Sequence, residues 1–445
     1  MKNRLFIFDL DGVLIDSKEV HYLALNKALS DINEKYIINK EDQQNIFEGL
    51  STNQKLKLLS NTRGLPEYMH DQIWKMKQEH SILFFNLVKK DYELIDIFKE
   101  IKSNGIGIAV ASNSIRKTLE TCLKSLGLYD LVDFYISNED VKNPKPDPEM
   151  YNICINNLES SPSITTIFED SYVGRSSAVL SGARLVSIKN RNDLNIEKIK
   201  LEILNNRKKV NVLIPMAGEG SRFKMAGYEK PKPLIDINGK SMIQTVVENI
   251  GYPANYIFII KKEDDNKYDI ENHIKSFCQN AKIIYQNGKV DGAAVTALLA
   301  KTIIDNDEPL IIANSDQYVI WNSKKTINNF IKSGIDGGIL TFFANEKKWS
   351  FVKKNESDFI SAVAEKNVIS NEATCGIYYW KHGADFVKYA EKMINKKIKT
   401  NNEYYICPVY NEAIEDEKII LSEKVYEMWG IGTPEDLSIF LDFYK

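Results

Sequence analysis

The stretch RLFIFDLDG, residues 4–12, predicts the fold of the first half of this 445-residue chain. An apolar run that ends in Asp9, Asp11 and Gly12 is typical of a buried strand whose polar end opens into a site. Packing two acids together is costly unless a cation lies between them, so the pair suggests a Mg²⁺ site. The alternative is an Asp-Gly turn that merely closes the strand.

Similar apolar runs alternate with amphipathic stretches along the whole chain. IGIAVAS (106–112) and TTIFED (165–170) predict further strands of the first sheet. A second set of strands is predicted by NVLIPMAG (211–218), YIFIIKK (256–262), AKIIYQN (281–287) and PLIIANSD (309–316). Strands separated by helices indicate the α/β class, with two doubly wound Rossmann-like sheets and ligands beyond the carboxyl ends of the strands.

The length of the chain exceeds what one hydrophobic core supports, which indicates at least two domains. We expect a first domain over residues 1–205 and a second over residues 210–445. Within the first, residues 16–85 are helical in pattern and predict an all-helical cap inserted after the first strand. The polar helical stretch at 192–209 is interpreted as a linker helix between the domains.

Composition excludes several classes of protein. A net charge of −3 provides no basic field for nucleic acid or for an anionic membrane. The five cysteines are scattered without a CxxC pair, which argues against disulfides or a zinc site and suits a reducing cytoplasm. The N-terminus is a poor signal peptide, and no apolar stretch reaches the roughly 18 residues that span a bilayer. A cytoplasmic protein is therefore expected.

The later strands of the first half also end in polar residues. Ser112 and Asn113 follow the second strand, and Lys145 lies in a proline-rich turn. The strand TTIF ends in Glu169 and Asp170. The order is acid pair, hydroxyl, ammonium and acid pair, each at a strand end or in a loop. Ser112 and Asn113 are good hydrogen-bond partners for a phosphate.

The segments FDLDGVLIDS (8–17), VASNS (110–114), KPDPEMY (145–151) and FEDSYVG (168–174) resemble the four motifs of the haloacid-dehalogenase superfamily, in its subgroup with a helical cap. The resemblance implies that Asp9 is the nucleophile and Asp11 the general acid and base. It implies that Ser112 and Lys145 hold the phosphoryl oxygens, with Asn113 beside them. The Mg²⁺ ligands it implies are Asp9, the carbonyl of Asp11, Glu169 and Asp170.

The cap loop EGLST (48–52) matches the specificity loop of that superfamily. Related β-phosphoglucomutases carry a basic residue where Thr52 stands, so this chain lacks a clamp for a second phosphate. A phosphatase is therefore predicted, with a phosphomutase as the alternative. His21 is interpreted as a helix residue that packs near the cap hinge, in preference to a substrate contact.

In the second half, NVLIPMA leads into Gly218, Gly220, Ser221 and Arg222. Small residues let the backbone approach a triphosphate, and an Arg suits a polyphosphate better than dinucleotide packing. Lys232 lies between two prolines in a stiff segment, although a solvated loop lysine is the simpler interpretation. A second glycine-rich element at 291–294 and an Asp316 that follows the strand PLIIA favour a site with Mg²⁺.

These elements resemble the sugar-phosphate nucleotidyltransferases. The matching text is LIPMAGEGSRF (213–223), KPLIDINGKSMI (232–243), DGAAVTALLA (291–300), NSD (314–316), VAEKN (363–367), CGIYYW (375–380) and GTPEDL (432–437). The resemblance implies that a nucleoside triphosphate is bound by Gly218, Gly220, Ser221 and Arg222. Lys232 would neutralise its phosphates, and Asp316 would hold Mg²⁺.

The same resemblance assigns the remaining subsites. Gln286, Gly292 and Ala293 stand where relatives contact the base. Glu365 and Lys366 match the pair that binds the sugar phosphate, and Gly376 matches backbone along the sugar. One position departs from the pattern: Gly430 stands where many relatives have a second acidic Mg²⁺ ligand. Either the triphosphate and water complete the metal shell or another acid substitutes, while Pro434–Asp436 is interpreted as a helix start.

Together these features predict a bifunctional, Mg²⁺-dependent enzyme. One half would transfer a nucleotide, with CTP as the donor, to a sugar or polyol phosphate. The other would hydrolyse a phosphate ester, and the pairing suits activated-sugar synthesis for a capsule or another surface glycan. Alternatives for the first half are a phosphomutase or a catalytically silent binding domain. The aromatics of residues 378–380 and 404–405 are interpreted as core more readily than as a sugar platform.

Overall fold

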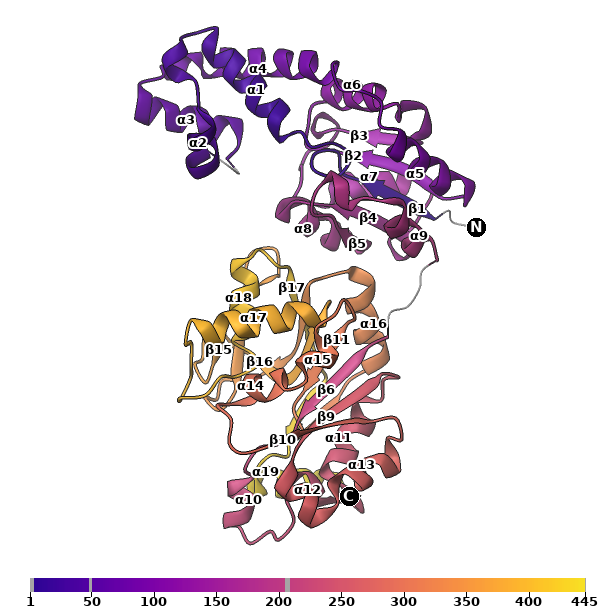
Figure 1. Ribbon diagram of the computed structural model, residues 1–445, viewed down its shortest axis with the longest axis vertical. Helices are drawn as coiled ribbons and strands as arrows, with labels where there is room; N and C mark the ends of the chain where they lie inside the picture. The colour runs from indigo at the N-terminus through magenta and orange to yellow at the C-terminus, as the bar shows by residue number, and fades with distance from the viewer. Residues whose placement is uncertain (1–3, 48–49, 205–208, 445) are drawn as a thin grey trace. The chain divides into compact units, whose positions relative to one another are not determined.

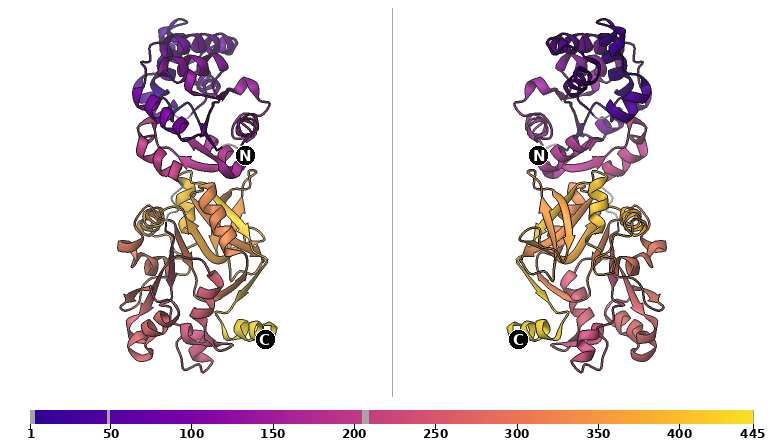
Figure 2. Two further views of the ribbon diagram at one scale, coloured as in Figure 1. Left: turned by 90° about the vertical axis from the view of Figure 1, so that its right-hand side faces the viewer. Right: turned by 90° about the vertical axis from the view of Figure 1, so that its left-hand side faces the viewer.

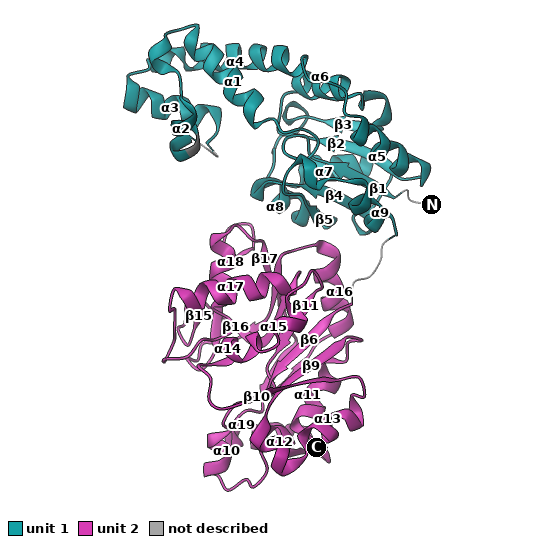
Figure 3. Ribbon diagram, in the orientation of Figure 1, with its two compact units in different colours: residues 1–206 teal, residues 207–445 magenta. Residues whose placement is uncertain are grey.

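The computed structural model describes residues 4–47, 50–204 and 209–444 (Figure 1). The chain forms two compact units, Met1–Asn206 and Arg207–Lys445 (Figure 3). In the described ranges, no helix is both long and apolar enough to cross a membrane.

Unit 1 contains a five-stranded parallel sheet of order β3-β2-β1-β4-β5. Its strands are β1 (Leu5–Phe8), β2 (Gly107–Ala111), β3 (Phe134–Ile136), β4 (Thr165–Glu169) and β5 (Arg184–Ser187). The associated helices are α5 (Tyr92–Ser103), α6 (Arg116–Leu126), α7 (Glu149–Asn157), α8 (Tyr172–Leu180) and α9 (Ile196–Leu204). The side views show helices flanking the strands (Figure 2). Because β1 lies at the centre, Asp9 and Asp11 emerge between the ends of β2 and β4.

The segment between β1 and α5 is helical, which agrees with the predicted cap. Its α-helices are α1 (Lys18–Ser30), α2 (Lys40–Asp42), α3 (Thr52–Arg63) and α4 (His70–Phe85). Helix α3 begins at a capping box formed by Ser51 and Gln54 and ends at Gly64, whose positive φ suits a helix C-cap. Leu25, Leu56 and Ile73 belong to a hydrophobic core of the cap itself. Glu48 and Gly49 of the expected specificity loop lie outside the described residues.

The expectation of a linker helix at 192–209 was wrong for its first part. Leu194 and Ile199 are buried in the core of unit 1, and helix α9 packs against α5. Arg4 also donates to the carbonyl of Ile203 at 2.7 Å. Although the stretch is mostly polar, its apolar side chains pack into the same core as the side chains of the sheet.

Unit 2 contains a nine-stranded sheet whose main path is β10-β9-β6-β11-β16-β13-β17. Its strands are β6 (Asn211–Pro215), β9 (Asn255–Lys261), β10 (Lys282–Gln286), β11 (Leu310–Ala313), β13 (Gly337–Phe343), β14 (Ser350–Lys354), β15 (Ile360–Glu365), β16 (Glu372–Trp380) and β17 (Ile420–Lys424). The four strands predicted from sequence, β10, β9, β6 and β11, pair with one another in parallel. Strand β16 runs antiparallel to β11 and to β13, so the sheet is mixed, which the sequence did not indicate.

Two short sheets and ten α-helices complete the described part of unit 2. The short strands are β7 (Asp236–Ile237), β8 (Lys240–Ser241), β12 (Gln317–Ile320) and β18 (Glu427–Gly430). The helices are α10 (Ser221–Met225), α11 (Met242–Ile250), α12 (Lys262–Tyr268), α13 (Ile270–Phe277), α14 (Ala293–Leu298), α15 (Lys301–Ile304), α16 (Ser323–Ser333), α17 (Gly383–Asn395), α18 (Val409–Glu415) and α19 (Pro434–Phe443).

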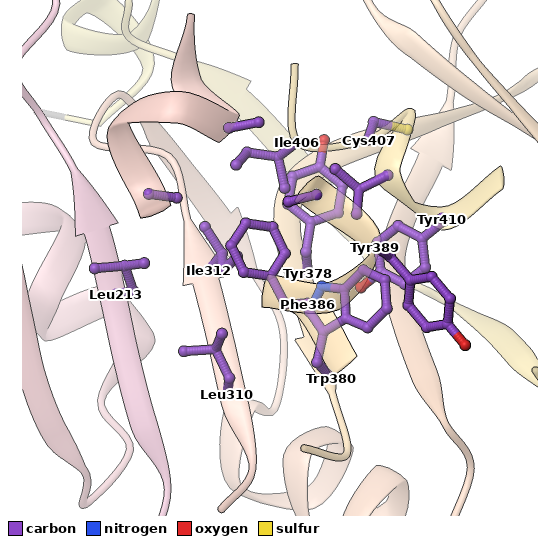
Figure 4. Close-up of a cluster of buried hydrophobic side chains, with 14 of the residues drawn as sticks. Leu213, Leu310, Ile312, Tyr378, Trp380, Phe386, Tyr389, Ile406, Cys407 and Tyr410 are labelled. Carbon is purple, nitrogen blue, oxygen red and sulfur yellow. The ribbon is translucent and has the colours of Figure 1, made fainter. Parts of the chain in front are cut away.

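The core of unit 2 is rich in aromatic side chains (Figure 4). The rings of Trp380 and Tyr410 stack with their centroids 4.2 Å apart. Tyr378, Tyr379 and Tyr404 are also buried, so these members of the aromatic group belong to the core. Tyr405, whose side chain is only partly buried, is the exception.

Candidate functional site

The site of unit 1 forms where β1, β2 and β4 end. Asp9 follows β1, and its backbone N–H donates to the carbonyl of Phe168 on β4 at 3.0 Å. Lys145 Nζ lies 2.7 Å from Asp9 Oδ1 and 2.6 Å from Glu169 Oε1, and it donates to the carbonyl of Ala111 at 2.8 Å. The turn expected to present a lysine therefore places a buried ammonium between two buried acids.

Electrostatics at this centre are dominated by burial. Burial raises the pKa of Asp9 well above its ordinary value, and the charge of Glu169 raises it further, while Lys145 opposes both. Burial lowers the pKa of Lys145, but the carboxylates of Asp9 and Glu169 outweigh this and raise the pKa above its usual range. The ammonium therefore stays charged and holds the Asp9 carboxyl group in place.

Asp170 completes a group of three acids that fits a divalent cation. One carboxylate oxygen from each of Asp9, Glu169 and Asp170 lies within 4.8 Å of the others. Burial, and then the charge of Glu169, raises the pKa of Asp170 to about 6. A Cβ at Gly12 would lie 2.0 Å from Asp170 Oδ2, so glycine is required for the acid to approach. A bound cation would relieve the repulsion among these acids.

Asp11 faces a different set of partners. Ser114 Oγ donates to Asp11 Oδ2 at 3.0 Å, and Ser112 Oγ lies 3.4 Å from the same oxygen. His21 Nε2 lies 3.3 Å from Asp11 Oδ1. Burial raises the pKa of Asp11, but hydrogen bonds, led by that of His21, bring the pKa below its ordinary value. His21, expected only to pack, therefore contacts the predicted acid and base.

Tyr151 and Lys77 contact this site, although no role was predicted for either from the sequence. Tyr151 donates to Glu169 Oε1 at 2.6 Å, and Lys77 of α4 lies 3.1 Å from His21 Nδ1. Burial lowers the pKa of Lys77 to about 8, against the charge of Asp11, which raises it. Asn113 contacts the backbone of the predicted lysine, because its side-chain oxygen accepts from the backbone N–H of Lys145 at 3.2 Å. The pairing of α1 with α4 in the cap brings His21 and Lys77 together.

The site of unit 2 centres on Lys232 and Asp316. Lys232 Nζ forms an ion pair with Asp316 Oδ2. A Cβ at Gly220 would lie 3.3 Å from Lys232 Cβ, so the glycine loop passes beside this lysine. A Cβ at Gly432 would lie 2.3 Å from Asp316 Oδ2, which leaves one side of the acid lined by backbone. An ammonium and an acid thus meet beside the loop that follows β6.

That loop leaves room at Gly218, where a Cβ would meet no atom within 4 Å. Gly220 adopts a positive φ of 59° and precedes α10, whose exposed residues include Ser221 and Arg222. Of the two glycines, Gly220 therefore lies beside Lys232, and Arg222 is exposed on the short helix that follows.

The residues predicted near the base serve the local structure as well. Gln286 is buried, accepts from Thr296 Oγ1 at 3.1 Å and donates to the carbonyl of Gly288 at 3.1 Å. Gly292 adopts a φ of 105°, and a Cβ there would lie 2.5 Å from the carbonyl oxygen of Tyr404. Ala293 begins α14 directly after it.

Glu365 and Lys366 lie at the end of β15. Burial raises the pKa of Glu365, whose carboxylate accepts from Ser350 Oγ. Lys366 Nζ donates to the hydroxyl of Tyr405 at 2.6 Å. The predicted pair therefore consists of a half-buried acid and an ammonium that is held by a tyrosine.

Gly376, in β16, has a φ of 75°. A Cβ there would lie 2.2 Å from Asn314 Nδ2 and 2.6 Å from Gln317 Oε1. Only glycine fits between these amides, close to Asp316.

Gly430 stands where many relatives have an acidic Mg²⁺ ligand, and another acid, Asp436, lies near this position. Gly430 pairs with Gln317, next to Asp316, and a Cβ at Gly430 would lie 3.7 Å from Asp436 Oδ2. Helix α19 begins as expected, because Pro434 occupies its first turn and Thr433 accepts from the backbone N–H of Asp436. The acid nearest the missing ligand therefore comes from the first turn of this helix.

Unit 1 combines a parallel sheet, a helical cap and a buried lysine between two acids, which is typical of a phosphate-ester hydrolase. Unit 2 places an ammonium and an acid beside a glycine-containing loop. Residues 211–441 match the nucleotidyl transferase family, and residues 6–188 match the haloacid dehalogenase-like hydrolase family. The chain belongs to the nucleotidyl transferase family, with a haloacid dehalogenase-like hydrolase domain fused before it. Both domains belong to enzyme families.

Individual relatives match one half each. The chain is 26% identical over 176 residues to a phosphorylated carbohydrates phosphatase of Thermotoga maritima, covering 40% of this chain and 80% of that protein. It is 28% identical over 233 residues to the bifunctional protein GlmU of Methanocaldococcus jannaschii, covering 51% of this chain and 52% of that protein. A solved nucleoside-diphosphate-sugar pyrophosphorylase of Vibrio cholerae aligns with a TM-score of 0.46 and 23% identity, over 52% of this chain and 99% of that chain.

Proposed function

We propose that the chain is a bifunctional Mg²⁺-dependent enzyme. Unit 2 transfers a nucleotide, with CTP as the first donor to test, to a sugar or polyol phosphate and releases pyrophosphate. Unit 1 hydrolyses a phosphate monoester in the same synthesis of an activated sugar for a capsule or another surface glycan. One observation carries the proposal: each unit sets a lysine ammonium against a carboxylate at the carboxyl ends of parallel strands.

In unit 1, a carboxylate oxygen of Asp9 attacks the phosphorus of the ester and forms an aspartyl phosphate. The alcohol leaves with a proton from Asp11, which must first gain that proton from solvent. Water then attacks the aspartyl phosphate, Asp11 takes the proton, and inorganic phosphate leaves with Asp9 restored. Lys145 offsets charge on the transferred oxygens, and Ser112 and Asn113 border them. Asp9, Glu169 and Asp170, with the Asp11 carbonyl, would hold a Mg²⁺ ion, which would supply further countercharge.

In unit 2, a phosphate oxygen of the acceptor attacks the α-phosphorus of the triphosphate, and pyrophosphate leaves without a covalent enzyme intermediate. Lys232 neutralises the triphosphate, while the loop of Gly218, Gly220, Ser221 and Arg222 surrounds it. Lys366 binds the acceptor phosphate. The base and sugar are bordered by Gln286, Gly292, Ala293, Glu365 and Gly376. Alignment and charge neutralisation account for catalysis, and Mg²⁺ at Asp316 adds countercharge.

The phosphomutase alternative for unit 1 is less well supported. A mutase must hold a second phosphate, and Thr52 offers no cation for it. A silent binding domain is also disfavoured, because Lys145 contacts both Asp9 and Glu169 within a closed network. Burying three charged groups costs free energy, and a domain that only packs against partners has no need of them.

A substrate screen tests the proposal. The five common nucleoside triphosphates are combined with sugar and polyol phosphates, and pyrophosphate, free phosphate and isomerised sugar phosphate are scored separately. We expect Asp9→Asn to abolish free phosphate release only and Lys232→Ala to abolish pyrophosphate release only. Unchanged phosphate release in Asp9→Asn would favour the silent domain, and isomerised product would favour the mutase. Retained pyrophosphate release in Lys232→Ala would refute the role of Lys232.

A further inference from the structure

Lys366 has an unusual backbone conformation. Its φ is 55°, in the left-handed region that non-glycine residues seldom adopt. Its backbone N–H donates to the carbonyl of Trp349 at 3.0 Å, directly after the last residue of β15. Such a conformation costs free energy and persists where surrounding contacts hold it, often at functional sites. The backbone therefore fixes the direction in which this side chain leaves the strand.

The side chain of Lys366 forms a hydrogen bond with Tyr405. Nζ donates to the tyrosine hydroxyl at 2.6 Å. A short hydrogen bond from a charged donor to a half-buried tyrosine restricts the direction of the ammonium. An ammonium has three donors, so two remain for an anion.

Tyr405 in turn lies on a segment that is fixed to the glycine-rich loop at 291–294. The backbone N–H of Tyr404 donates to the carbonyl of Asp291 at 2.8 Å, and the N–H of Ala294 donates to the carbonyl of Tyr404 at 3.0 Å. Gly292 packs so closely against Tyr404 that it has no room for a Cβ. Tyr404, the residue directly before the tyrosine that contacts Lys366, is thus anchored by backbone hydrogen bonds on both sides of Gly292.

We propose that Tyr405 is a positioning residue that holds the Lys366 ammonium ready for the phosphate of the acceptor. The inference rests on the proposed nucleotidyl transfer, in which Lys366 binds that phosphate. Without the hydroxyl, the lysine keeps its charge but loses its fixed direction. Anion binding at Lys366 then weakens, while sites that do not involve Tyr405 are unaffected.

The neighbouring Tyr404 provides a matched control. Its hydroxyl lies 3.4 Å from the carbonyl of Ile394, and its ring is buried in the core. Tyr404→Phe and Tyr405→Phe remove the same atom from adjacent residues. An effect of general loosening would therefore appear in both variants, whereas loss of positioning appears only in Tyr405→Phe.

The test measures acetylation of individual lysines in the full chain by acetic anhydride and mass spectrometry, with inorganic phosphate as the probe. The measured quantity is the phosphate concentration that halves acetylation of Lys366. Lys232 reports anion binding at the triphosphate site, and exposed Lys347 reports general reactivity. We expect Tyr405→Phe to raise the concentration for Lys366 about three- to tenfold and to leave that for Lys232 unchanged. Tyr404→Phe should match the unaltered protein at both lysines.

Each other result has a distinct meaning. Equal protection of Lys366 in the unaltered protein and in Tyr405→Phe would overturn the positioning role and leave the proposed function standing. Equal weakening in both tyrosine variants would also overturn it, because the cause would then be general loosening. Failure of phosphate to protect Lys366 in the unaltered protein would remove Lys366 from the acceptor site and the inference with it.

Discussion

The two units each use one lysine at the centre of their site, but in different surroundings. The side chain of Lys145 is 3% exposed and contacts two carboxylates, whereas that of Lys232 is 22% exposed and pairs with Asp316. A buried ammonium between two buried acids is part of the fold, because removing it leaves two unpaired charges in the core. A partly exposed ion pair contributes little to stability, so loss of Lys232 should leave the fold intact.

The largest effect expected from this comparison is that of Lys145→Met. We expect loss of phosphate release together with a decrease in the free energy of unfolding of unit 1 of about 3–5 kcal/mol, since Asp9 and Glu169 lose their shared partner. Denaturant unfolding of the full chain measures the stability. The exposed Lys142→Met is the control and should change neither quantity. Wild-type stability of Lys145→Met would show that the buried network does not support the fold.

Lys232→Met should separate catalysis from stability. We expect pyrophosphate release to fall about 100-fold or more, because the developing phosphate charge loses its countercharge. The free energy of unfolding should change by less than about 1 kcal/mol, since the lost ion pair is partly exposed. Lys230→Met, two residues earlier and exposed, is the matched control. If unit 2 instead unfolded on loss of Lys232, the contrast with Lys145 would disappear.

Two glycines sharpen the comparison within unit 2. A Cβ at Gly218 meets no atom, so Gly218→Ala should fold normally yet raise the KM for the triphosphate about tenfold, if the backbone approaches the phosphates there. Gly376→Ala should lower stability by about 1–3 kcal/mol, because its positive φ and the amides of Asn314 and Gln317 exclude a methyl group. Thermal unfolding and steady-state kinetics separate the two effects. An unchanged KM in Gly218→Ala would argue against close approach at that residue.

The smallest expected effect concerns Lys77 in unit 1. Burial lowers the pKa of Lys77 to about 8 in the folded chain, below the ordinary lysine value. Between pH 8 and about 10, the unfolded chain therefore holds a proton that the folded chain has released, and this group's contribution to stability rises with pH. The difference in Tm between Lys77→Met and the unaltered protein should change across this range. A constant difference from pH 7 to pH 10 would contradict the lowered pKa.

Much of the parallel framework could be predicted from the sequence. A strand that is buried on both faces has to be continuously apolar, so apolar runs predict such strands. The runs before Asp9 and Ser112 and the run that ends at Glu169 are strands, and they lie next to one another in the sheet. The antiparallel strand β16 was missed. Its residues are buried throughout, as in a parallel strand, so the pattern carries no direction.

The partners of the predicted residues were harder to foresee. Lys145 and Asp9 stand at strand ends and in a loop, where family motifs mark them. Tyr151, which contacts Glu169, sits on a helix, where a tyrosine is ordinarily a core residue. Lys77 reaches His21 only because α1 and α4 pack together in the cap. Local sequence patterns do not predict such contacts between segments that are distant in the chain.

The sequence by itself determined which residues carry charge to the strand ends, because strand periodicity and loop chemistry are local properties of the chain. Tertiary structure alone decided how each charge is solvated. Lys145 became buried between two acids, Lys232 remained partly exposed, and Lys366 came to rest against Tyr405. The physical reason is that burial and pairing depend on segments brought together by folding, which residue type and spacing do not specify.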